Sequence, residues 1–187
     1  LVSWLGPGVD AVLDAWRAAR DAGDLTLSYD PNARPGTVPR EVMRERVEDF
    51  VRLSDVVKVS DEDLAFLYPE ESAEAVCARW VESGPGLVVL TRGPRGLAAW
   101  RPGRDMVEVP GRPVAVADTV GAGDTVSAAL LVGLGDLGAL GTGGDIATLS
   151  DADIAMILDR AAAAAAITCS REGAQPPTRA EVDASLG

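Results

Sequence analysis

Histidine is absent from this chain of 187 residues, and its absence excludes several classes of catalytic site. Ser-His-Asp triads, histidine general bases and zinc sites of the H-E-x-x-H type all require an imidazole ring. Cysteine is also scarce: Cys77 and Cys169 form no C-x-x-C pair, so neither a disulfide framework nor a cysteine zinc site is indicated. Any proton transfer on this chain would therefore fall to carboxylates.

Positive charge and long apolar runs are in short supply too. Asp and Glu outnumber Lys and Arg by 29 to 17, and no basic stripe is visible. Nucleic-acid binding draws its affinity from clustered Lys and Arg, so we expect no nucleic-acid partner. The alanine-rich run 161–167 is too short and too weakly apolar to cross a bilayer. We therefore expect a cytoplasmic protein with no membrane partner.

Composition supports one folded unit. Hydrophobic residues make up 47% of the chain, which is enough for a sizeable core, so we expect a single α/β domain over residues 1–187. The first residue is Leu1 instead of Met, and the opening segment lacks the charged start and cleavage site of a signal peptide. We expect the chain to be a fragment of a longer protein.

Short β-rich runs alternate with longer segments of helical period, which is typical of a parallel sheet covered by helices on both faces. Apolar spacing predicts helices at residues 9–22, 39–53, 72–83, 124–134 and 150–169, with a last helix after Thr178. Apolar runs predict strands at residues 25–29, 56–59 and 87–90, then a hairpin of 97–100 and 106–109. Gly23 and Gly135 are expected to end the helices before them. The predicted fold class is three-layer α/β with a mainly parallel sheet.

Polar or glycine-rich clusters follow several of the predicted strands. They lie at residues 30–35, 60–63, 91–96 and 118–124. In open α/β sheets ligands bind beyond the carboxyl ends of the strands, so these clusters are the candidates for a functional site. Their convergence is a stronger indication than any one cluster alone.

The glycine-rich cluster Gly121, Ala122, Gly123 and Asp124 leads directly into a predicted helix. Small residues let the backbone approach a phosphate, and free N–H groups at a helix start stabilise negative charge. Asp124 would be held where it could accept a proton from a substrate hydroxyl. The alternative is that Asp124 only caps the helix and the glycines only form a tight turn.

The longer string 118–124, Asp-Thr-Val-Gly-Ala-Gly-Asp, resembles the second signature of the ribokinase-like (PfkB) carbohydrate kinases. Residues 30–35 (Asp-Pro-Asn-Ala-Arg-Pro) and 58–63 (Lys-Val-Ser-Asp-Glu-Asp) look like segments of the fructokinase and ketogluconate kinase branches. Residues 91–96 and 169–174 also match in order. The resemblance implies a ribokinase-like fold. The family's glycine-rich first signature, its N-terminal strands and its small β lid have no counterpart in this chain.

The resemblance implies a role for each matching residue. Asp124 would be the base that activates the sugar hydroxyl, and Gly121, Ala122 and Gly123 would supply the amides of an anion hole. Arg34 would meet phosphate or substrate oxygens with its planar fork, although a solvated arginine in a proline-rich loop is the alternative.

The nucleotide site would include Thr91, Gly93 and Gly96, which resemble residues around the phosphates and ribose of ATP; a plain turn between strands is the alternative. Ser60 and Asp63 occupy the spacing at which the family has an amide or hydroxyl residue and then Glu near magnesium, although the same pattern is an ordinary helix cap. Mg²⁺ is expected with ATP in either case. Asp118 resembles part of the family's monovalent-cation region, so K⁺ is a further candidate ion.

These implications together predict an ATP-dependent sugar kinase, with fructose as the first substrate to test. A 2-keto-3-deoxygluconate-type sugar acid is the nearest alternative substrate, and a non-catalytic nucleotide- or sugar-binding paralogue is the alternative class. The family often dimerises through its lid, so a homodimer is expected of the full-length protein. No Walker G-x-x-x-x-G-K-[ST] motif is present, which excludes P-loop NTPases.

Overall fold

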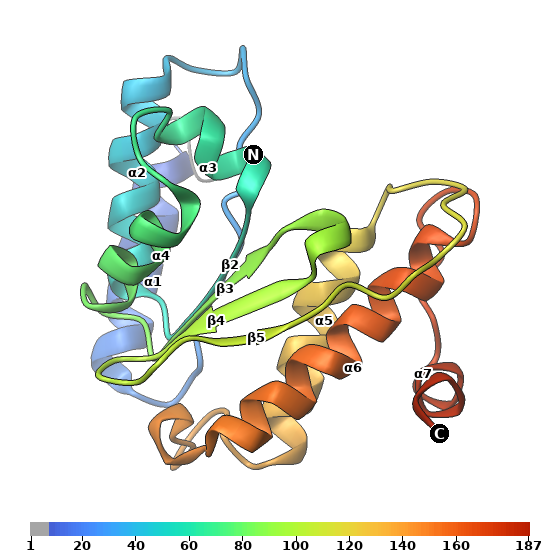
Figure 1. Ribbon diagram of the computed structural model, residues 1–187. Helices are drawn as coiled ribbons and strands as arrows, with labels where there is room; N and C mark the ends of the chain where they lie inside the picture. The colour runs from blue at the N-terminus through green and yellow to red at the C-terminus, as the bar shows by residue number, and fades with distance from the viewer. Residues whose placement is uncertain (1–7) are drawn as a thin grey trace.

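The computed structural model describes residues 8–187, which form a sheet between two layers of helices (Figure 1). The helices are α1 (Gly8–Ala22), α2 (Arg40–Leu53), α3 (Asp61–Leu67), α4 (Ala73–Val81), α5 (Ala122–Asp136), α6 (Asp151–Cys169) and α7 (Arg179–Leu186). The strands are β1 (Ser28–Tyr29), β2 (Val56–Ser60), β3 (Leu87–Thr91), β4 (Leu97–Trp100) and β5 (Val107–Val109), and two short 3₁₀ helices are η1 (Gly93–Arg95) and η2 (Ile146–Thr148). The predicted three-layer α/β class is confirmed.

The sheet has the order β1-β2-β3-β4-β5. Strands β1, β2 and β3 are parallel, so their carboxyl ends share one edge of the sheet, and β4 and β5 continue as an antiparallel hairpin. Ser60 lies opposite Thr91 at the shared edge. The chain segments that follow β1, β2 and β3 therefore emerge side by side.

Alternation along the strands assigns each side chain to one of two cores. Val57 and Val59 face the core that α1, α2, α3 and α4 cover. Val56 and Val89 face the opposite core, which α5 and α6 cover. Successive strand residues point to opposite faces, so a strand that is buried on both sides reads as an unbroken apolar run. This is why the runs at 56–59 and 87–90 could be recognised in the sequence.

Helices α5 and α6 pack closely because small residues line their contact. A β-carbon on Gly133 would lie 2.9 Å from Cγ1 of Ile157, so the glycine is what allows α5 to approach α6 at that point. Helix α7 packs on the other side of α6 through Val182, which contacts Ala163 and Ala164. The first turn of α5 is thereby placed at the carboxyl edge of the sheet (Figure 1).

Three local predictions differ from the structure. The strand predicted at residues 25–29 is limited to Ser28–Tyr29, because Leu25 is 64% exposed and does not join the sheet. Gly135 does not end its helix: α5 runs to Asp136, and the left-handed residue beyond its end is Gly138. Helix α3 is not among the helices predicted from the sequence. The side chain of Ser60 caps it, which agrees with the alternative that Ser60 and Asp63 form an ordinary helix cap.

Candidate active site

The first turn of α5 has an unusual start. Gly121, the residue before the helix, has a φ of 80° and offers no side-chain cap. A β-carbon there would lie 3.0 Å from Cβ of Ala174, so both backbone conformation and close packing favour glycine. Within residues 8–187, the N–H groups of Gly123 and Asp124 have no hydrogen-bond acceptor. Two free N–H groups at a helix start form a site for negative charge.

Asp124 lies in this same turn. Its side chain is exposed and makes no hydrogen bond or ion pair in the described part of the chain. The helix cap that the sequence left as an alternative is therefore not formed by this carboxylate. An exposed, unpaired carboxylate next to free N–H groups is able to accept a proton from a bound hydroxyl.

A cavity of about 460 Å³ opens beside the start of α5. It brings together five residues that the sequence analysis had singled out, from β3, the β3–β4 connection and α5: Thr91, Gly93, Gly96, Ala122 and Gly123. The opposite wall is apolar and built from small side chains of α6 and from exposed valines of the 111–116 segment. The volume lies within the range of small-molecule sites, and the cavity combines an apolar wall with a helix start.

Glycine occupies two positions of the β3–β4 connection for different structural reasons. Gly96 has a φ of 88°, and a β-carbon on it would meet the carbonyl oxygen of Val109 at 2.1 Å, so glycine is needed for the chain crossing itself. Gly93 has a φ of 53° and no atom within 4 Å of its β-carbon position. Gly93 therefore leaves open space at the cavity wall, whereas Gly96 is required by packing.

A buried ion pair that sequence reasoning did not predict lies under the same helix start. Lys58 of β2 has a side chain only 6% exposed, and its Nζ lies 2.6 Å from Oδ2 of Asp30, which follows β1. A β-carbon on Gly123 would lie 3.0 Å from the same Nζ, so the ammonium packs against the first turn of α5. In the sequence, the sign of this ion pair is a lysine inside the apolar run 56–59, because burying an unpaired charge costs free energy.

The hydroxyl of Ser60 is used as a helix cap: it accepts a hydrogen bond of 3.0 Å from the N–H of Asp63. Burial raises the pKa of the Asp63 carboxyl, and the negative charge of Asp30 adds to the increase, while the hydroxyl of Ser60 and the charge of Lys58 oppose it. Asp63 therefore lies near both Asp30 and Lys58, but within residues 8–187 only Asp30 forms an ion pair with the ammonium.

Asp118 joins two loops behind the start of α5. Its Oδ1 accepts from the N–H of Val120 at 3.1 Å, and its Oδ2 accepts from the N–H of Gly173 at 3.0 Å. These backbone donors lower the pKa of the Asp118 carboxyl.

Arg34 is exposed, and its guanidinium has no partner among residues 8–187. Arg34 does not line the cavity beside α5.

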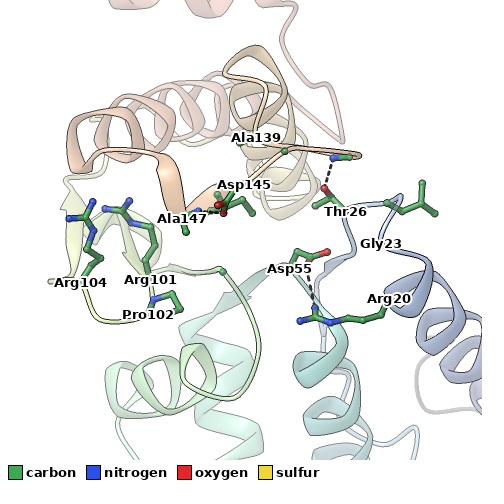
Figure 2. Close-up of a pocket in the computed structure, with 15 residues that line it drawn as sticks. Arg20, Gly23, Thr26, Asp55, Arg101, Pro102, Arg104, Ala139, Asp145 and Ala147 are labelled. Carbon is green, nitrogen blue, oxygen red and sulfur yellow. Dashed lines mark hydrogen bonds and ion pairs between the residues drawn. The ribbon is translucent and has the colours of Figure 1, made fainter.

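A second hollow of about 310 Å³ lies at the opposite edge of the sheet (Figure 2). Its charged groups already have partners: Arg20 pairs with Asp55, as Figure 2 shows, and Arg101 bonds to the carbonyl of Leu149 and to Asp151. Of the groups there, Arg104 alone is a charged side chain without a partner among the described residues. This hollow offers no acid, base or nucleophile that is free to act.

Neither a cluster of metal ligands nor a membrane span has a candidate within residues 8–187. No group of three or more Cys, Asp or Glu side chains within residues 8–187 is arranged to hold a metal ion. Over the same residues, none of the helices has the length and apolar character needed to cross a membrane.

A three-layer α/β fold with free helix N–H groups and an adjacent cavity at the carboxyl edge defines a class of proteins that bind phosphorylated ligands. Residues 7–181 match the model of the pfkB family of carbohydrate kinases. The chain belongs to this family.

Several proteins with similar sequences are fructokinases. The chain is 38% identical to a fructokinase of Rhizobium leguminosarum over 130 residues, and 35% identical to fructokinase-1 of rice, Oryza sativa, over 183 residues. These matches cover 69% and 94% of the chain. They cover only 38% and 53% of the two relatives, so the chain spans about half of their length or less.

Solved structures agree with the fold. The chain superposes over its whole length on 58% of a fructokinase double mutant from Vibrio cholerae, determined with fructose, ADP and potassium, with a TM-score of 0.83 and 27% identity. It also superposes with a TM-score of 0.83 on fructokinase from Xylella fastidiosa with bound ATP; 98% of this chain and 58% of that one are covered at 24% identity. The second likeness concerns the fold alone.

Proposed function

We propose that the protein containing this chain is an ATP-dependent sugar kinase of the fructokinase type, and that residues 1–187 form its nucleotide-binding and catalytic domain. One observation carries the proposal: the exposed carboxylate of Asp124 adjoins two free N–H groups beside a nucleotide-sized cavity. Membership of the pfkB family and the similarity to fructokinases support it. The free thiols of Cys77 and Cys169 agree with a cytoplasmic location.

In the proposed reaction Asp124 accepts the proton of a sugar hydroxyl as that oxygen forms a bond to the γ-phosphorus of ATP. The bond between that phosphorus and the bridging oxygen breaks, and ADP leaves with the bonding electron pair. The free N–H groups of Gly123 and Asp124 are proposed to stabilise the negative charge on the transferring group, whereas the N–H of Ala122 donates to the carbonyl oxygen of Thr119 at 3.2 Å. Positioning and electrostatics carry most of the catalysis in phosphoryl transfer of this kind.

The nucleotide is proposed to lie in the cavity lined by Thr91, Gly93 and Gly96, with its base on the apolar wall of α6. Mg²⁺ bound with ATP would neutralise phosphate charge. Asp63 is the proposed carboxylate for it, because it lies in the first turn of α3 directly after β2 and forms no ion pair within residues 8–187. We propose that Arg34, whose guanidinium is unpaired, contacts substrate oxygens.

Two further expectations belong to this proposal. Asp118 keeps acceptor capacity after binding two N–H groups, so K⁺ near it stays a prediction. A homodimer of the full-length protein stays a prediction as well.

The decisive experiment compares wild type with Asp124→Asn in the longest natural polypeptide that contains residues 1–187. ADP formation is measured with Mg²⁺ over a panel that includes fructose and 2-keto-3-deoxygluconate, and ATP binding is titrated in parallel. We expect wild type to turn over fructose and Asp124→Asn to bind ATP about as well while losing at least ~1000-fold in kcat.

Asp10→Asn is the matched control, because Asp10 is also an exposed carboxylate in the first turn of a helix. It should leave turnover unchanged. Turnover of the sugar acid but not fructose would move the substrate to that alternative. ATP binding with no turnover of any sugar would favour the non-catalytic paralogue, and equal activity of wild type and Asp124→Asn would remove Asp124 from the mechanism.

A further inference from the structure

The ion pair of Asp30 and Lys58 lies against the first turn of α5, beside the cavity proposed for the nucleotide, although neither residue lines that cavity. Lys58 is almost fully buried, and its Nζ contacts both Oδ2 of Asp30 and the first turn of α5 at Gly123. The start of a helix carries a partial positive charge, so a buried cation at this place is unfavourable unless an anion compensates it. Asp30 is the compensating anion that the structure provides.

In the described part of the chain, the ion pair of Asp30 and Lys58 leaves hydrogen-bonding groups of both side chains unsatisfied. Oδ1 of Asp30 is buried and has no hydrogen-bond partner within residues 8–187. An ammonium has three N–H donors, and within residues 8–187 Lys58 pairs with a single carboxylate oxygen. A buried ion pair with unsatisfied groups costs stability compared with apolar side chains of similar size. Stability alone therefore does not explain why this pair occupies the site.

We infer that Asp30 is a positioning residue that holds the ammonium of Lys58 against the anion hole of α5, so that its charge acts on the terminal phosphate of the nucleotide. The inference rests on the proposed function, because it needs a phosphate at the start of α5. Gly123 belongs to the same arrangement, since the missing side chain leaves the room that Nζ occupies.

The effect should be specific for the terminal phosphate of ATP. A charge-assisted contact of an ammonium with an oxyanion contributes more than a neutral hydrogen bond. Removing Lys58 should therefore weaken ATP binding more than ADP binding, because ADP lacks the group that the ammonium faces. Asp30 should act only through Lys58, so its loss should matter little once the lysine has been removed.

The test measures the affinities for ATP and ADP by equilibrium titration, and kcat, in the longest natural polypeptide that contains residues 1–187. The variants are Lys58→Met, Asp30→Asn and the double variant. The double variant removes both charges with little change of volume, so it should fold even where Lys58→Met leaves the partly buried Asp30 unpaired. Arg20→Met, which removes one cation at the opposite edge of the sheet, controls for net charge.

We expect Lys58→Met and the double variant to lose about 10- to 100-fold in ATP affinity, against a loss of less than about threefold for ADP. Asp30→Asn should show an intermediate loss in ATP affinity and in kcat, and the double variant should be no worse than Lys58→Met. Arg20→Met should keep the wild-type ratio of the two affinities.

A double variant that keeps both the wild-type affinity ratio and the wild-type kcat would overturn the inference and leave the kinase proposal standing. Additive losses in the two single variants would show that Asp30 does not act through Lys58, which also overturns it. Wild-type protein that binds neither nucleotide would contradict the kinase proposal itself, and the inference with it.

Discussion

Thr125 and Thr168 share a buried hydrogen bond, with 2.9 Å between their Oγ1 atoms, across the contact of α5 and α6. Thr168 also donates to the carbonyl of Ala164 at 3.1 Å. Because the hydroxyl hydrogen of Thr168 is used there, Thr125 is the donor in the bond between the two threonines. This bond ties the residue after Asp124 to the last turn of α6, so it helps to hold the proposed base in place.

This assignment of donor and acceptor predicts unequal costs for two similar substitutions. Thr168→Val leaves the hydroxyl of Thr125 buried without an acceptor and should lower the free energy of unfolding by about 2–3 kcal/mol. Thr125→Val removes only a donor and should cost about 1 kcal/mol. The double variant should cost less than the sum. Urea unfolding of all three proteins measures these differences, and equal single costs would reverse the assignment.

The two glycines of the β3–β4 connection give a second prediction. Gly96→Ala places a β-carbon against backbone atoms and should lower the free energy of unfolding by about 3 kcal/mol or more. Gly93→Ala meets no atom and should cost only about 1 kcal/mol, the penalty of its positive φ. Gly93→Ala should instead weaken ATP binding, which titration of the folded variant measures. Equal free energies of unfolding for the two variants would contradict the close approach of Gly96 to the backbone of Val109.

The sequence allowed most of the fold to be predicted, because the information was local. The apolar runs at 56–59 and 87–90 are strands in the structure, and Gly23 does follow the end of α1. The predictions that were wrong depended on tertiary contacts. Leu25 belongs to an apolar run, yet no neighbouring strand pairs with it, and its exposure could not be seen in the run itself.

The candidate site divides in the same way. The string Gly121–Asp124 indicated a helix start with free N–H groups, since glycine and alanine leave the backbone open. The contact of Lys58 with Asp30 joins a residue of β2 to the residue that follows β1, so only the folded sheet reveals it. The sequence could show that a lysine in an apolar run needs a partner, but not which carboxylate provides it.

The carboxylate of Asp118 gives a third prediction, on the loops behind α5. Asp118→Ala removes the acceptor of the Val120 and Gly173 N–H groups, so both amides should exchange with solvent about 10- to 100-fold faster. Hydrogen exchange followed by NMR measures this directly. Asp105→Ala, at an exposed aspartate with no partner within residues 8–187, is the control and should change neither rate. Unchanged exchange in Asp118→Ala would show that the loops do not depend on this carboxylate.

Glu48 links α2 to α4 and to the end of α3, in the helix layer that lies across the sheet from α5 and α6. Its Oε1 accepts from the hydroxyl of Tyr68 at 2.6 Å, from Nη1 of Arg79 at 2.8 Å and from Nε1 of Trp80 at 3.2 Å. Burial by itself would raise the pKa of this carboxyl. The hydrogen bonds from Arg79, Tyr68 and Trp80, together with the charge of Arg79, outweigh burial and lower it from its ordinary value of 4.5.

This lowered pKa predicts how stability depends on pH. A group whose pKa is lower in the folded state stabilises the fold above its unfolded-state pKa, and that stabilisation is lost as the pH falls through the folded-state pKa. The contribution of Glu48 should therefore be complete above about pH 5 and decline below pH 4.5. Glu48→Gln cannot titrate, so its free energy of unfolding should fall less steeply over that range.

At pH 7 Glu48→Gln should be less stable than wild type by about 1–2 kcal/mol, because a neutral oxygen accepts more weakly than a carboxylate. The two proteins should approach one another in stability below pH 4. Glu45→Gln on the same helix is the matched control, because Glu45 is an exposed carboxylate with no partner in the part of the chain that the structure describes. Urea unfolding at several pH values measures all three, and a gap between wild type and Glu48→Gln that stays constant with pH would show that the network does not lower the pKa of Glu48.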